Sequence, residues 1–208
     1  MASTASPYGL RAVNEIGGLP YAGSTRTFLI DPAGTAANIY NGSPVYVNAS
    51  GYLAVATATG ADATTNGFPV GTANTGIVGV FTGCSYVNAQ GQQIWSQYYP
   101  TGVTGVITAT VVDDPDVVFQ VQSAGTVTQA ALGSNVFFST GAVATGSTTT
   151  GNSTASVVAG ASAVTTTAAF RVVGFANIQG FSTVGDAYTD LLVKINPGYH
   201  SYTNAVGL

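Results

Sequence analysis

Apolar and polar side chains alternate along two neighbouring stretches near the middle of the chain. At residues 106–112, and again at 117–122, every second position is apolar. Period-two alternation is typical of β-strands with one buried face. The apolar positions of the predicted buried faces are Ile107, Ala109, Val111, Val117, Phe119 and Val121. We therefore predict two core strands here.

A cluster of carboxylates, Asp113-Asp114-Pro115-Asp116, separates these two strands. The proline ring fixes its own φ and suits the second position of a tight turn, whose polar groups the aspartates can bind. Clustered carboxylates also suit hard cations, but a calcium loop spreads its ligands over about twelve residues around a central glycine. We predict a structural turn and no metal site.

Further alternating stretches are bounded by glycine, proline and asparagine, as strands commonly are. They lie at residues 25–30, 38–47, 51–58, 76–88, 92–99, 169–177 and 188–196, with turns at 48–51 and 89–91. The helix candidate at 128–132 is too short to be stable alone. The pattern predicts an all-β fold, a β-barrel or β-sandwich of about ten to twelve short antiparallel strands.

The first 24 residues combine apolar side chains with prolines and glycines in no regular period. We predict an extended N-terminal arm at 1–24, without strand or helix, followed by a β-domain at 25–208. Such arms usually become ordered along a partner surface. The candidate interface residues of the arm and its end are Tyr8, Leu10, Arg11, Tyr21 and Arg26.

The chain also contains a weak internal sequence repeat. The stretch 42–47 (GSPVYV) resembles 133–138 (GSNVFF), 91 positions later (133 − 42). The later Val-Gly pairs at Gly79 and Gly174 are 95 positions apart (174 − 79). These strides suggest a duplicated β-unit at about 25–100 and 101–198, followed by a tail at 199–208. Chance recurrence in so biased a composition is the alternative.

Two regions fall outside the strand pattern. Residues 141–169 are a low-complexity, nearly uncharged stretch, which we expect to be a surface excursion with one short strand at 156–159. Residues 59–75 are expected to be a loop. The tail at 199–202 follows Pro197-Gly198 and is expected either to dock on a neighbouring molecule or to extend freely.

Charge is scarce along the whole chain. Charged residues make up 6% of the 208 residues, and the formal net charge is −4. Such a surface lacks the repulsion that keeps monomers apart, and eleven tyrosines supply side chains that are enriched at interfaces. We therefore expect a homo-oligomer. With four positive side chains there is no basic stripe for nucleic acid. No apolar signal region or membrane-length stretch is present, so we expect folding in a cytoplasm and no membrane partner.

Few residues can support catalysis. The chain has one His, one Cys, one Glu and seven Asp. His200 lies in the tail and is expected at a surface or interface, and Cys84 is expected to be a small buried side chain. One Cys and one His cannot form a zinc site. We expect no enzyme activity and no cofactor. A glycan-binding module, or a glycosidase using Asp113, Asp114 or Asp116, is a more remote alternative.

Five stretches resemble a group of tailed-bacteriophage virion proteins, and together they span most of the chain. They are PYGLRAV at 7–13, GGLPYAGSTR at 17–26, GSPV at 42–45, VDDPDV at 112–117 and LVKIN at 192–196. Members of the group occur in head-gene neighbourhoods of marine and freshwater phages and act as capsid decoration, or cement, proteins. Two departures occur: Ala12 stands where the group commonly has proline, and the 141–169 stretch is longer.

The resemblance implies a β-module on the outer surface of an icosahedral capsid. Its partners would be the major capsid protein and further copies of itself, commonly as a trimer. The resemblance implies no catalytic site. A head fibre, tail or receptor-binding component of the virion is the alternative within structural proteins.

Overall fold

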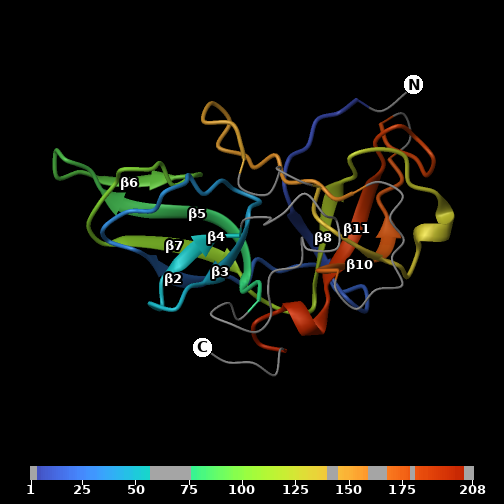
Figure 1. The fold of residues 1–208 in the computed structure, drawn as a ribbon, viewed down its shortest axis with the longest axis horizontal. Coiled ribbons are helices and arrows are strands. Elements are labelled where there is room, and N and C mark those ends of the chain that lie inside the picture. Colours follow the sequence, from blue (N-terminus) through green and yellow to red (C-terminus); the bar gives the residue numbers. More distant parts are fainter. Residues whose placement is uncertain (1–3, 57–75, 140–144, 159–167, 179–180, 204–208) are drawn as a thin grey trace.

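A computed structural model shows an all-β protein with eleven strands in two sheets, as the alternation predicted (Figure 1). The structure describes residues 4–56, 76–139, 145–158, 168–178 and 181–203, so the predicted loop at 59–75 lies outside the described residues. The helix candidate is a single 3₁₀ turn, Gln129–Ala131. No helix among the described residues is long and apolar enough to cross a membrane.

The first sheet closes on itself. Its strands are β2 (Arg26–Ile30), β3 (Pro44–Val47), β4 (Leu53–Val55), β5 (Gly79–Val87), β6 (Gln93–Ser96) and β7 (Ile107–Val112). Pairings run from β3 through β4, β2, β7 and β5 back to β3, while β6 is attached to β5 alone. We call this ring barrel 1. Its interior holds side chains from all five ring strands, including Ile30, Val45, Leu53, Phe81 and Val111.

The second sheet forms a similar ring. It contains β1 (Arg11–Glu15), β8 (Val117–Gln122), β9 (Asn135–Val136), β10 (Phe170–Phe175) and β11 (Asp190–Ile195), in the order β1-β8-β11-β10-β9. Val157 bridges to Ser123, just after β8, and to Phe138, just after β9, which completes the ring. We call it barrel 2. The two barrels lie side by side (Figure 1).

The two barrels share one pairing scheme. Pro44 pairs with Val80 in barrel 1, and Asn135 pairs with Arg171 in barrel 2, each 91 positions later (135 − 44; 171 − 80). The irregularity in β5 lies between Phe81 and Gly83, and that in β10 lies between Val172 and Gly174, again 91 positions on.

Hydrogen bonds just before the repeated strands β3 and β9 show the same offset of 91 positions. The Gly42 N–H donates to the Phe81 carbonyl at 2.8 Å, and the Gly133 N–H donates to the Val172 carbonyl at 2.9 Å. Chance recurrence of short motifs would not reproduce a strand order, a register and a bulge together. The structure therefore favours a duplicated unit.

The structure corrects two details of the predicted duplication. The later part of the repeat also recurs after 91 positions and not 95, because Gly83 and not Gly79 is the counterpart of Gly174 (174 − 83). The units span β2 to β7 and β8 to β11, because β7 pairs with β2 and β5 of barrel 1. The boundary is therefore the acidic corner at 113–116 and does not fall at residue 100.

Two of the segments predicted to lie outside the fold belong to it. The arm contains strand β1, which pairs antiparallel with β8, so the prediction of no strand at 1–24 was wrong. In the low-complexity stretch, Ala155 and Val157 are fully buried, so the described part of it, 145–158, is not a simple surface excursion.

Candidate functional site

The arm, predicted to reach a neighbouring molecule, packs on its own chain. Leu10 is 1% exposed within the core that spans barrel 2 and the junction of the barrels. Its N–H donates to the Gly42 carbonyl at 2.9 Å. The backbones approach so closely that a Cβ on Gly9 would lie 2.8 Å from the Gly42 oxygen. Leu10 therefore cannot fill a partner's pocket without leaving its own core, which corrects that expectation.

Tyr8 is held by a buried carboxylate of β11, and Arg11 lies over the Tyr8 ring. The Tyr8 hydroxyl donates to Asp190 Oδ1 at 3.0 Å, and the Arg11 guanidinium lies 4.4 Å from the centroid of the Tyr8 ring. Burial raises the pKa of Asp190, against the lowering effect of the Tyr8 hydrogen bond. Burial, then Asp190, raises the pKa of Tyr8 well above its ordinary value. Arg11 remains exposed, so its predicted place in an interface stays a prediction.

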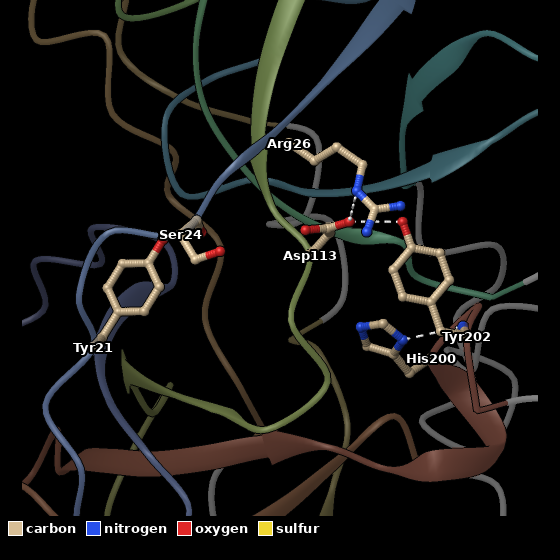
Figure 2. A network of polar contacts seen from close by, with 6 residues as sticks. All are labelled: Tyr21, Ser24, Arg26, Asp113, His200 and Tyr202. Carbon is tan, nitrogen blue, oxygen red and sulfur yellow. Dashed lines mark hydrogen bonds and ion pairs between the residues drawn. The ribbon is translucent and has the colours of Figure 1, made fainter.

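A polar network joins barrel 1, the acidic corner and the C-terminal tail (Figure 2). Arg26 Nε lies 3.0 Å from Asp113 Oδ2, and the Tyr202 hydroxyl donates to the same oxygen at 2.7 Å. The Arg26 guanidinium lies 5.2 Å from the Tyr202 ring centroid. Burial, then Asp113, raises the pKa of Tyr202 to about 12. The tail therefore docks on its own chain, and Arg26 is engaged within it.

His200 lies beside this network and is 1% exposed. Its Nδ1 accepts from the Tyr202 N–H at 3.2 Å, while Nε2 has no hydrogen-bond partner (Figure 2). Burial lowers the pKa of His200, and the nearby Asp113 opposes this effect. The expectation of a surface or interface histidine was wrong, because His200 pairs with Ile77, just before β5, and lies buried against its own chain.

The remaining carboxylates of the corner also have protein partners. Asp114 Oδ1 accepts from the Asp116 N–H at 2.8 Å, and the Val117 N–H donates to the Asp114 carbonyl at 3.3 Å, which places Pro115 second in the turn. Asp116 Oδ1 lies 2.6 Å from Lys194 Nζ. Among the described residues, no group of three or more His, Cys, Asp or Glu side chains could hold a metal ion.

A cleft of about 540 Å³ opens between the arm and the two barrels. Its floor is apolar, formed by Leu10, Val80, Val112 and Phe119, and its rim includes Arg11, Tyr21, Asn41, Gln97 and Asn152. Gln97 Nε2 donates to Asn152 Oδ1 at 2.7 Å. Tyr21 is turned back on its own loop, where its hydroxyl donates to the Ser24 carbonyl at 2.5 Å. An apolar floor with a few polar groups is the usual make-up of a binding site.

Among the described residues, no aspartate or glutamate lines the cleft. Glycosidases generally place two carboxylates across the scissile bond, so the described lining gives the glycosidase alternative no support. The residues that the structure brings together here come from widely separated parts of the chain, from Leu10 to Asn152, so no local motif could have revealed the cleft.

The chain matches no known family model, no curated protein and no solved structure with which it was compared. The interpretation below rests on the geometry described above and on the sequence resemblance.

Proposed function

We propose that this chain is a structural virion protein that decorates a tailed-phage capsid and cements it by bridging neighbouring major capsid subunits. The observation that supports this most is a set of large apolar side chains left exposed at separate points of both barrels. They are Leu19, Val106 and Phe181, with exposed fractions of 63%, 77% and 76%. They offer contact points on a body with few charges.

Several small contacts suit a cement protein better than one deep site does. Burying apolar area contributes roughly 25 cal/mol per Å², so each of these side chains adds a modest free energy of binding. On a symmetric shell, contacts made at once by one molecule act together and raise the overall affinity. The virion surface would be the site of action, and no cofactor or catalysis is involved.

The junction between the barrels is suited to transmitting load between two capsid contacts. Leu10 and the network of Arg26, Asp113 and Tyr202 fix barrel 1 against barrel 2. A rigid body with contact points on both barrels can clamp two neighbouring subunits, whereas a flexible linker would leave them free to move apart.

Co-sedimentation with undecorated shells tests the proposal. We expect the purified protein to pellet with shells of its own phage's major capsid protein, and to protect them against mechanical or thermal disruption. Phe181→Ser should weaken binding while circular dichroism and melting stay unchanged, with the exposed but polar Thr183→Ser as a matched control. Failure of the wild-type protein to pellet at micromolar concentration would contradict the proposal.

The cleft favours a second candidate, a head fibre, tail or receptor-binding component. An apolar floor and an amide-rich rim can bind a neutral ligand such as a glycan. The two candidates differ in copy number: hundreds of copies per particle indicate a cement protein, and a handful indicate a spike or tail component.

A further inference from the structure

The duplication shows that, among the described residues, no strand of barrel 1 fills the position that β1 occupies in barrel 2. In barrel 2 the outer edge of β8 is covered twice: Val157 pairs with Ser123, and β1 pairs with residues 117–120. In barrel 1, Leu53 pairs in parallel with Ile30, as Val157 does with Ser123 in barrel 2. By this bridge β2 and β8 are 93 positions apart (123 − 30), two more than the 91 that relates β3 to β9 and β5 to β10. Residues 24–27 are the counterparts of 117–120 (117 − 24 = 93). Arg26 and Thr27 pair with β7 on one edge, and no described strand pairs with residues 24–27 on the other edge.

This unpaired edge is open to solvent. Residues 22–27 are all exposed, and Leu29 is 51% exposed. In barrel 2 the Val157 N–H donates to the Gln122 carbonyl at 3.1 Å, so the backbone of Gln122 faces outward. Backbone direction alternates along an antiparallel strand, so Gln120 and Val118 face outward too. By the same correspondence, Thr27 and Thr25 of barrel 1 present their N–H and carbonyl groups to solvent.

A strand of matching length is also unpaired on one side. Among the described strands, β6 pairs with β5 alone. The Asn88 N–H donates to the Gln92 carbonyl at 2.9 Å, so alternation turns the backbones of Gln93 and Trp95 away from β5. Trp95, on this free edge, is 79% exposed.

Neither edge carries the features that prevent sheet edges from associating. Monomeric proteins usually protect such edges with lysine, proline or inward-pointing charges. Strand β6 contains no charged residue and no proline, and the one charge of β2, Arg26, is paired with Asp113. Every copy of the chain supplies both edges.

We propose that β6 of one copy pairs antiparallel with residues 24–27 of a second copy, in the position that β1 occupies on β8. In this register Gln93 lies opposite Thr27, and Trp95 lies opposite Thr25. Thr25 lines the 540 Å³ cleft, and directly opposed side chains point to the same face of a sheet. The indole of Trp95 therefore lies at the mouth of the cleft. There the contact removes both the indole and the apolar floor of the cleft from solvent.

The contact is heterologous, because two different edges meet. Repeated head-to-tail pairing gives a closed ring when the rotation closes. This self-association does not depend on the proposed capsid role, so it is tested without capsid present.

Light scattering after gel filtration is the first test. Wild-type protein should be a closed oligomer at micromolar concentration. Thr27→Pro removes an outward N–H without breaking a bond to β7, and it should weaken self-association tenfold or more. Trp95→Ser should do the same. Thr27→Ala keeps the N–H, and Phe181→Ser removes an equally exposed ring elsewhere; both should leave association unchanged. A monomeric wild type, or equal loss in the controls, would overturn the proposal.

Cysteine cross-linking tests the register. Thr25→Cys and Trp95→Cys variants, each oxidised with oxidised glutathione, should form disulfide-linked dimers when mixed and not when alone, since opposed residues in such a pair lie about 5.5 Å apart at Cα. Cys84 is buried, and burial raises the pKa of its thiol to about 12, so it does not compete. Cross-linking of Thr25→Cys with itself would indicate pairing of β2 with β2 and would overturn the proposal. Loss of capsid binding with the cross-link retained would count against the proposed function alone.

Discussion

Truncating Leu10 to alanine should destabilise the whole protein, because this side chain belongs to the core and not to a partner surface. Leu10 is 1% exposed, and its N–H is bound to Gly42 of barrel 1. Replacing a fully buried leucine with alanine lowers the free energy of unfolding by about 2–5 kcal/mol, because apolar burial is lost and a cavity remains. The neighbouring backbones of Gly9 and Gly42 are already in contact, so the site cannot collapse much further. We therefore expect a loss of about 3 kcal/mol.

Urea unfolding followed by far-ultraviolet circular dichroism measures this loss. For a chain of this length the melting temperature should fall by roughly 6–12 °C, at about 2–4 °C per kcal/mol. Leu19→Ala is the matched control: it truncates the same residue type in the same arm, but at a position that is 63% exposed, so it should change stability by about 0.5 kcal/mol or less. If Leu10→Ala costs no more than Leu19→Ala, the arm is not part of the core and our reasoning fails.

Three further changes test other parts of the structure. Burial lowers the pKa of His200 below its ordinary 6.5, so the unfolded chain binds a proton before the folded chain does as the pH falls. The His200 contribution to stability should therefore be full above pH 6.5 and decline below it. Thermal melts between about pH 8 and 5 should show this decline in the wild type and not in His200→Gln. Asp113→Asn removes the ion pair with Arg26 and should cost about 1 kcal/mol in urea unfolding, more than Asp114→Asn; equal costs would count against the network. Gly79→Ala would place a Cβ 2.1 Å from the Val112 carbonyl oxygen, so it should lower the free energy of unfolding by about 3 kcal/mol or prevent folding. Gly198→Ala, with open space around it, should be tolerated. A stable Gly79→Ala protein would refute the close packing of β5 on β7.

The core strands were predictable because side-chain alternation is a local property. Ile107 and Val111 of β7, and Val121 of β8, are fully buried, as their spacing predicted. Ring closure was not predictable, because it depends on pairings between distant strands. In barrel 2 it rests on Val157, which lies in the short strand predicted at 156–159, but nothing in that repetitive stretch indicates that Val157 pairs with the distant Ser123 and Phe138.

The strand in the arm was missed for a physical reason. The pairing of β1 with β8 shifts between Ala12 and Asn14, so a bulge at Val13 breaks the period-two pattern. The duplication was visible but misaligned, because Val-Gly-like pairs occur near both Gly79 and Gly83, and only the shared bulge shows which is the counterpart of Gly174.

Part of the candidate site could be predicted and part could not. The acidic corner was evident from its composition, and Arg26 was singled out for its charge. Tyr202 and His200 were not recognised as partners of the corner, because they lie about 90 positions away, beyond a Pro-Gly break that favours a loose tail. The cleft was invisible for the same reason.

Cryo-electron microscopy of phage particles, with and without this protein, tests the central proposal most directly. Our account predicts density for the two barrels at repeated lattice positions on the outer capsid surface, bridging neighbouring capsid subunits in hundreds of copies, and loss of that density when the gene is deleted. Density confined to the tail or to a single vertex in a handful of copies, or a capsid surface unchanged by the deletion, would contradict it.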